Sequence, residues 1–361
     1  MNKILNNYLI FGYFKIVFNT ILIFISLGIV LNLFEEIEFF KNLNESLQLP
    51  IVLSLSFVPN LVIELLPFII FISSMWFFSS IRSNTDLLSA KIFGFSNLKI
   101  TLMTSVAAFA FGFLILFAIN PITSALVKYY EETKAQYSKD VDHLISINKN
   151  GVWIKEIGAS GSNIISAKKL DNEKLNSLSI YIFNDNNQMT NRIEANSADI
   201  SSNPWIIEKA KIYNFTNNDV IENEINYEFE TTYTLEKINS LYKNLNTVSF
   251  LSLITEYEIL NEMGYSKKIL NEKINKFISL PFFLAIMVIL AALFTIGSLK
   301  RDQNFYVIIV SIITCVIVYY FKDLSLALGQ TSRISITLSV WMPILAIALF
   351  TSIGIIQINE K

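Results

Sequence analysis

Long apolar stretches occupy both ends of this chain, and a polar stretch from Lys128 to Lys273 separates them. A transmembrane helix needs about 20 mostly apolar residues to cross about 30 Å of hydrocarbon. The predicted spans cover residues 16–34, 59–81, 100–119, 277–299, 305–321 and 336–356. An amphipathic segment at 47–58 leads into the second span, and the third is expected to stop at Asn120-Pro121.

The polar stretch has the pattern of β-strands. Short runs rich in branched and aromatic residues cover 151–156, 163–167, 178–183 and 204–213, and turn clusters lie at 184–187 and 216–219. Strands at this spacing predict a sandwich or jelly roll, with Trp153 and Trp205 in its core. After Thr247 the apolar residues recur at the spacing typical of an α-helix. Gly264 is expected to end one helix, and Ser266 to cap the next, which continues into the fourth span.

The predicted fold class is therefore a membrane α-helical protein of six transmembrane helices with an inserted all-β, jelly-roll-like domain. Residues 1–127 are expected to form transmembrane helices 1–3, with a short cytoplasmic helix at about 84–93. Residues 128–246 are expected to form the β domain. Residues 247–361 are expected to form connecting helices and transmembrane helices 4–6.

Lys and Arg residues in the short loops predict the orientation, because these residues collect on the cytoplasmic side. One side of the predicted topology holds Lys3, Arg82, Lys91, Lys99, Lys300, Arg301 and Lys361, and the other holds Lys41, Lys322 and Arg333. Both termini are therefore expected in the cytoplasm and the β domain outside it. The first apolar stretch has no small-residue cleavage site after it, so it is expected to be retained as a span.

Composition narrows the classes of function. Hydrophobic residues make up 53% of the 361 residues, and charged residues 16%, against about 25% in an ordinary globular protein. The net charge of −2 argues against a nucleic-acid partner. The single cysteine, Cys315, excludes an intrachain disulfide, and the single histidine, His143, excludes an all-histidine metal site. The sequence contains no P-loop, H-E-x-x-H or G-x-S-x-G motif, so we expect no catalytic, cofactor-binding or metal site in this chain.

Few charged residues lie inside the predicted spans. Glu64 is the one carboxylate well inside a span, and it is either functional or close enough to the outer end to reach the interface. Lys322 and Asp323, at the outer end of the fifth span, are either a lipid-facing pair or interfacial residues that extend their charges to water.

The loop at 83–96 has the pattern of a short amphipathic helix. Asn84 or Thr85 can cap it, Asp86 suits its positive N-terminus, and Gly94 ends it. Its apolar face is formed by Leu87, Leu88 and Ile92. The loop is either an interfacial connection between two spans or a coupling helix that docks in a groove of a cytoplasmic motor subunit.

Several short segments occur along the chain in a characteristic order and spacing: Pro59 and Pro67, Asp86 with Gly94-Phe95-Ser96, residues 151–155, 178–184, 194–198 and 260–266, Leu280-Pro281, and Trp341-Met342-Pro343. Taken together, they resemble the lipopolysaccharide-export permeases of the LptF/LptG type over nearly the whole chain. Residues 320–323 and the Trp-x-Pro start of the sixth span look more like LptG than LptF.

The resemblance implies a permease subunit in the bacterial inner membrane. It implies three kinds of partner: an LptF-like sister permease, a cytoplasmic LptB-like ATPase dimer that uses ATP and Mg, and periplasmic LptC/LptA-like jelly-roll bridge proteins. Lipopolysaccharide would enter a cavity sideways from the outer leaflet and pass up the bridge. The implied ATPase-coupling residues are Thr85, Asp86, Leu87, Leu88, Ala90, Lys91 and Gly94.

The resemblance also implies lipid contacts at the outer ends of the first and fifth spans. The candidate residues are Phe34, Lys41, Lys322, Asp323 and Arg333. Family members of the LptG type often carry several cations after the first span, whereas residues 35–41 here contain three glutamates and only one cation, Lys41. This departure is compatible with a less phosphorylated lipid. The alternative function is a non-transporting membrane anchor or assembly factor whose β domain binds partners.

Overall fold

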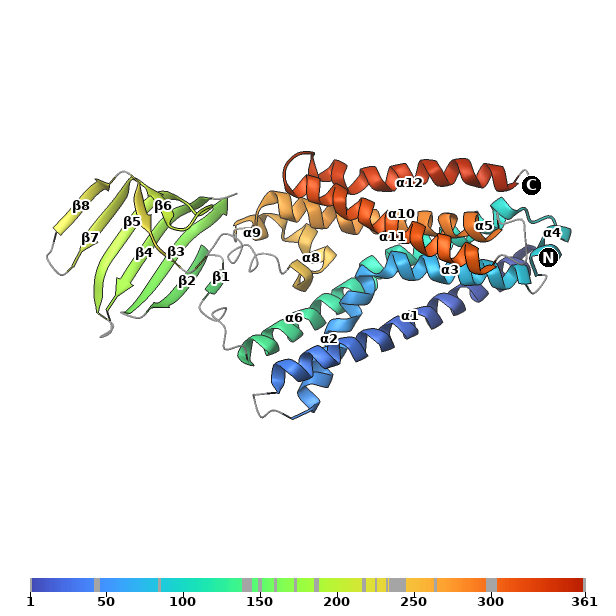
Figure 1. Ribbon diagram of the computed structural model, residues 1–361, viewed down its shortest axis with the longest axis horizontal. Coiled ribbons are helices and arrows are strands. Elements are labelled where there is room, and N and C mark those ends of the chain that lie inside the picture. Colours follow the sequence, from blue (N-terminus) through green and yellow to red (C-terminus); the bar gives the residue numbers. More distant parts are fainter. Residues whose placement is uncertain are drawn as a thin grey trace. The chain divides into compact units, whose positions relative to one another are not determined.

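The computed structural model divides the chain into two compact units, residues 1–127 with 271–361 and residues 128–270, which we treat separately. The first unit is helical, and the second contains the strands (Figure 1). The structure describes residues 2–41, 46–83, 86–137, 145–148, 151–158, 161–171, 174–184, 188–215, 219–224, 226–231, 233, 245–262, 265–296 and 304–359.

Six helices in the described ranges are long and apolar enough to cross a membrane, which confirms the predicted number of spans. The helices of this part of the chain are α1 (Asn2–Phe40), α2 (Gln48–Glu64), α3 (Leu66–Ser83), α4 (Asp86–Ile92), α5 (Asn97–Leu114), the π-helical η1 (Ile115–Ile119), α6 (Asn120–Tyr137), α10 (Lys267–Ile296), α11 (Asn304–Gln330) and α12 (Ile336–Asn359). In the helical unit, α4 and the starts of α1 and α5 lie at the same end as the last turns of α12 (Figure 1).

The second predicted span is interrupted, so its expected start at Pro59 is wrong. Pro59 lies inside α2, and the helix breaks at Leu65 before α3 begins. Pro67 explains the break, because proline has no N–H and its ring collides with the carbonyl four residues earlier. The crossing helix is therefore Leu66–Ser83, and α2 is a separate, shorter apolar helix.

The third helical run continues beyond its predicted end at Asn120-Pro121. It passes from α5 through η1 into α6, which ends at Tyr137. In the π-turn the N–H of Asn120 donates to the carbonyl of Ile115. Pro121 then occupies the first turn of α6, where a missing N–H costs little. A proline that normally ends a helix is accommodated here by one wide turn.

Two crossing helices, α5 and α10, approach each other closely at Gly112. A Cβ atom added to Gly112 would lie 2.6 Å from the Cα of Pro281, so only glycine fits at this crossing. The Ser105 hydroxyl donates to the carbonyl of Ala285 at 3.0 Å, and the rings of Phe109 and Phe282 lie 5.0 Å apart. These contacts make α10 a central helix of the bundle.

The second unit contains nine strands in its described residues, all in one antiparallel sheet. The strands are β1 (Ile145–Asn148), β2 (Gly151–Gly158), β3 (Gly161–Asp171), β4 (Lys174–Phe183), β5 (Met189–Asp199), β6 (Trp205–Glu208), β7 (Ala210–Asn214), β8 (Asp219–Glu224) and β9 (Tyr227–Phe229). Strands β1 to β5 pair in sequence order. This confirms the inserted all-β domain.

A row of isoleucines crosses this sheet on its buried face. Neighbouring strands align these residues in the order Ile154, Ile165, Ile180, Ile193 and Ile212. All five are 9% exposed or less. Directly paired residues share a face of the sheet, so this row sets the register and forms the centre of the apolar core.

The sheet divides at β5, which the sequence pattern did not predict. The run expected to be one strand at 204–213 is two strands, β6 and β7, separated by Lys209 with a φ of 55°. The two strands pair with opposite ends of β5, and β9 and β8 extend them. The strand β5 itself lacked the pattern because it is mostly polar, with Ile193 as its only branched aliphatic residue.

The two tryptophans of the insert have different environments. Trp205 is fully buried and its indole N–H donates to the carbonyl of Tyr233 at 3.0 Å, which confirms its expected place in the core. Trp153 is 38% exposed, so its prediction as a core residue is wrong. Alternation along β2 gives the physical reason, because Val152 and Ile154 point into the core and Trp153 must face the other way.

Short helices follow the sheet: η3 (Leu245–Thr247), α8 (Phe250–Thr255) and α9 (Tyr257–Glu262). The hydroxyl of Ser266 accepts a hydrogen bond from the N–H of Ile269 at 3.3 Å, which confirms Ser266 as the cap of α10. Gly264, the predicted helix end, lies outside the described residues.

The contact between α5 and α10 can be tested with one added methyl group. We expect Gly112→Ala to lower the free energy of unfolding by about 1–3 kcal/mol, because the backbone of Pro281 cannot move away without separating the helices. The matched control is Gly12→Ala, whose added Cβ would meet Phe77 at an ordinary 3.7 Å. Thermal unfolding of both variants in the same detergent measures the difference. Equal midpoints for the two variants would contradict the proposed tight crossing.

Candidate functional site

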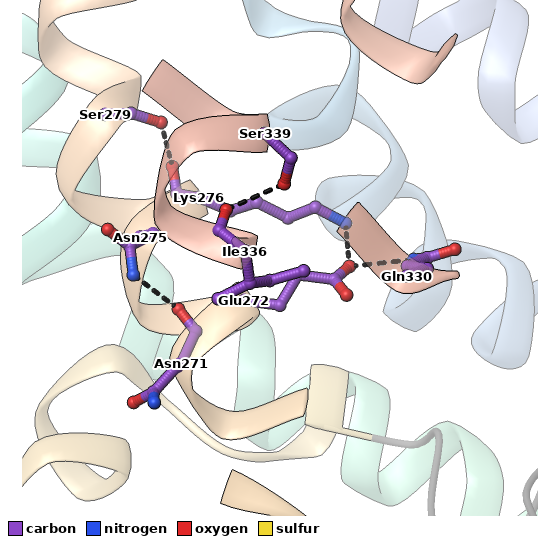
Figure 2. A network of polar contacts seen from close by, with 8 residues as sticks. All are labelled: Asn271, Glu272, Asn275, Lys276, Ser279, Gln330, Ile336 and Ser339. Atoms are coloured by element: carbon purple, nitrogen blue, oxygen red, sulfur yellow. Dashed lines mark hydrogen bonds and ion pairs between the residues drawn. The ribbon is translucent and has the colours of Figure 1, made fainter. Parts of the chain in front are cut away.

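A polar network joins α10 to α11 at the end of the helical unit opposite α4 (Figure 2). The carboxylate of Glu272, which is 9% exposed, accepts hydrogen bonds from Lys276 at 2.8 Å and from Gln330 at 3.0 Å. Lys276 lies one turn after Glu272 on α10, and Gln330 is the last residue of α11. The network therefore fixes the end of α11 to the first half of α10.

The same end of α10 is also fixed to α12. The indole N–H of Trp341 donates to the side-chain oxygen of Asn275 at 3.1 Å, and its ring lies 5.5 Å from that of Phe282. The hydroxyl of Ser325 on α11 donates to the carbonyl of Ser339 on α12 at 2.7 Å. Three helices thus meet here through buried and half-buried polar contacts, which are costly to break in an apolar surrounding.

Lys322 lies beside this network and is partly buried. Its ammonium group is 5.1 Å from the centre of the Phe283 ring and 5.7 Å from that of Tyr319. Aromatic faces stabilise a cation without neutralising it. The Tyr319 hydroxyl in turn accepts a hydrogen bond from the N–H of Phe68 on α3 at 3.3 Å. Lys322 is therefore held in place by side chains from two helices.

Two further lysines of α10, Lys273 and Lys276, complete a charged cluster with Lys322. Lys322 interacts electrostatically with Lys276, Glu64 and Asp323, and Lys273 interacts with Glu64. The sequence analysis named Lys322 and Asp323 but missed Lys273 and Lys276, because the start of α10 was assigned to a connecting helix. Their spacing of three residues on one helix was the signal that could have found them.

The other predicted lipid contacts are separate from this cluster. Phe34 is 69% exposed near the end of α1, and Lys41 is exposed just after that helix. Arg333 is exposed in the turn between α11 and α12. Glu64, by contrast, interacts electrostatically with Lys273 and Lys322 of the cluster, is exposed at the end of α2 and accepts a hydrogen bond from Asn60 at 3.1 Å. Within the described ranges, no group of three or more histidine, cysteine or acidic side chains is arranged to hold a metal ion.

The helix α4 occupies most of the loop that predicted a short helix. Gly94 has a φ of 79°, its N–H donates to the carbonyl of Lys91, and the N–H of Phe95 donates to that of Ala90. This is the Schellman arrangement that ends helices, and it brings the buried side chains of Phe95 and Ala90 into the core. Thr85 lies outside the described residues, and Asp86 is described only as the first residue of α4.

The side chains of α4 divide into an inner and an outer set. Leu87 and Ala90 pack against the core of the bundle, whereas Leu88 and Ile92 are 61% and 75% exposed. Phe93, just after the helix, is 54% exposed, and Lys91 is exposed as well. The apolar face expected from the sequence is thus split, with Leu87 directed inward and Leu88 and Ile92 outward.

The two least buried crossing helices are α1 and α11. Only 22% of the residues in each apolar window are buried, compared with 61% in α3. Their exposed side chains are large and apolar, and they include Phe11, Leu31 and Phe34 on α1, and Ile317 and Tyr320 on α11. In a membrane these faces contact lipid or another apolar helix.

Comparison with known proteins agrees with this arrangement of six apolar helices and an inserted sheet. A search of curated proteins finds no match. The sequence model of the family described as lipopolysaccharide export system permease LptF/LptG matches residues 7–357, which is nearly the whole chain. That model covers LptF and LptG together, so the assignment to LptG stays a prediction. The chain therefore belongs to the LptF/LptG family of lipopolysaccharide-export permeases, multi-pass proteins of the inner membrane that transport rather than catalyse.

Proposed function

We propose that this chain is one permease subunit of an ATP-driven exporter that extracts lipopolysaccharide from the outer leaflet of the inner membrane. One observation carries the proposal: α4 is anchored to the bundle on one side and presents Leu88, Ile92 and Phe93 to the outside on the other. A motor subunit can push on such a helix without displacing it from the bundle.

The partner at α4 is an LptB-like ATPase dimer, which uses ATP and Mg. Full burial of one large apolar side chain contributes about 1.5–3 kcal/mol. Burial of Leu88, Ile92 and Phe93 against the ATPase would therefore stabilise the docked complex. The end of α3 is held beside this region, because Arg82 donates to the carbonyl of Thr295 at the end of α10 at 2.8 Å. Movement of α4 would therefore be transmitted to α10, which carries the charged cluster at its other end.

The lipid head group is proposed to bind near Lys322. Its ammonium is stabilised by aromatic rings, whereas Lys276 is already bonded to Glu272. A phosphate or carboxylate on the substrate would gain a charge-assisted hydrogen bond there. Lys41 and Arg333 are exposed at the same end of the bundle and are proposed as secondary contacts, with Phe34 and Asp323 at the sides of the lipid path.

The exposed faces of α1 and α11 are proposed to form a lateral gate with an LptF-like sister permease. The partner would present the same two helices in a pseudo-symmetric arrangement, so each gate would pair the first span of one subunit with the fifth of the other. Lipid tails could then leave the bilayer between two apolar helices without contact with water.

The β domain is proposed to pass the lipid to LptC/LptA-like bridge proteins. The acyl chains need an apolar surface on this route, because each CH₂ group gains about 0.8 kcal/mol on leaving water. Among the described strands, β1 and β9 end the main path of the sheet. An edge strand has backbone groups that can pair with a strand of a neighbouring protein, which would give a continuous bridge.

The topology of the proposal is testable with reporter fusions. Signals specific for the cytoplasm are expected at residue 90, within α4, because the short-loop lysines and arginines collect on that side. Signals specific for the periplasm are expected at residue 185. The reverse result at either position would contradict the orientation and with it the proposed direction of transport.

The proposed docking role of α4 predicts that variants of its exposed apolar residues no longer bind the ATPase but still fold. Leu88→Glu and Ile92→Glu should each reduce copurification of the ATPase at least tenfold, because a charge replaces an apolar contact at a surface site. Ile4→Glu, which adds the same charge at a 77% exposed isoleucine of α1, is the control and should copurify normally. Equal recovery of the ATPase from all three variants would show that the loop is only a connector, as in an anchor or assembly factor.

The lipid path predicts where substrate can be captured. Photo-crosslinkers at positions 34, 41 and 322 should label with lipopolysaccharide in an active complex, and one at position 93 should not. Lys322→Gln should weaken head-group capture at position 41, because it removes the cation beside the substrate path. Uniform labelling at all four positions, or labelling at position 93 alone, would refute this route.

A further inference from the structure

A groove lies between α1 and α5 near the α4 end of the helical unit. The groove has a volume of about 640 Å³, and α5 supplies most of its lining. The lining residues of α5 form two adjacent rows along the helix, in which successive residues are four positions apart. One row consists of Leu98, Leu102, Val106 and Ala110, and the other of Lys99, Met103 and Ala107. Side chains become smaller along both rows, so the groove opens away from Lys99.

Lys99 supplies the one charged side chain of the lining, and it lies at one end of the groove. Its ammonium is 3.9 Å from the centre of the Phe95 ring, and Phe95 is only 1% exposed. The ring is fixed in the core and is neutral, so it holds the cation in place and leaves its charge available. The groove is therefore apolar along its length, with a single positive charge at the end where its lining side chains are largest.

The length of the groove matches one leaflet of a membrane. From Leu98 to Ala110 the helix rises about 18 Å, at 1.5 Å per residue. Half of a hydrocarbon layer of about 30 Å is about 15 Å. The length and the apolar lining suit one flexible hydrocarbon chain.

We propose that this groove binds an acyl chain of an anionic glycerophospholipid, with the phosphate of that lipid at Lys99. A lysine at the surface of an anionic membrane contributes a favourable attraction to such head groups. Lys322, the proposed substrate contact, lies at the other end of the bundle, so the exported glycolipid is not the occupant. The assignment of the site to the cytoplasmic leaflet depends on the proposed topology, but the site itself does not.

The bound lipid would support the base of α4. Phe95, which carries the Lys99 ammonium on its ring, also makes the contact with Ala90 that ends α4. A phosphate bound at Lys99 would therefore stabilise the junction between α4 and α5, through which the motor is proposed to act. The lipid is a structural ligand in this view and is not transported.

The test compares retention of phosphatidylglycerol and phosphatidylcholine by the purified full-length chain with its copurifying partners, using native mass spectrometry at equal lipid concentrations. The wild type should retain phosphatidylglycerol preferentially. Lys99→Gln should lower that retention about fivefold, to the level of phosphatidylcholine. Lys3→Gln, which changes an exposed cation of α1 outside the groove, should retain both lipids as the wild type does.

A second variant tests the groove independently of the charge. Ala110 is exposed in the groove, so Ala110→Phe fills it without disturbing the core and should lower retention of both lipids. Equal thermal midpoints would verify that each variant is folded. Retention of phosphatidylglycerol that is unchanged in Lys99→Gln, or unchanged in Ala110→Phe, would overturn the proposal. A photo-crosslinker at position 106 that captures a protein helix instead of lipid would overturn it as well.

Discussion

The contact between Gly112 and Pro281 determines how closely the two central helices of the bundle approach, and the rest of the helical unit depends on it. Because glycine has no side chain, α5 can lie against the backbone of α10 at a kink-prone proline. Close approach allows van der Waals packing, which is the main attraction between helices in lipid. Without it, the buried face of α10 between Phe283 and Ala292 would lose its neighbours.

This central helix also connects the two ends of the bundle. At one end, Thr295 accepts a hydrogen bond from Arg82 beside α4, and at the other Glu272 holds the end of α11. A charged side chain near hydrocarbon is costly unless it is paired or otherwise stabilised. Here Glu272 is paired with Lys276, and Lys322 is stabilised by rings. A rigid helix between a docking surface and a charged cluster is well suited to transmit movement between them.

The β unit is stabilised differently, by an apolar core that its own strands bury. The isoleucine row provides a continuous apolar core across five strands, and Trp153 lies on the opposite face. The division of the sheet at Lys209 lets one central strand, β5, pair with two short strands at its two ends. The apolar face therefore extends beyond the width of the simple meander.

Sequence alone determined the features that depend on local chemistry. Hydrophobic length predicted six spans, and the caps at Gly94 and Ser266 were correct because a positive φ and a side-chain hydrogen bond are local properties. Tertiary structure decided what depends on residues distant in the chain. Lys276 joined Lys322 only when α10 packed against α11, and Trp153 turned outward because its neighbours on β2 filled the core. Pairing between distant segments leaves no periodic signal in either one, so only the folded chain could show it.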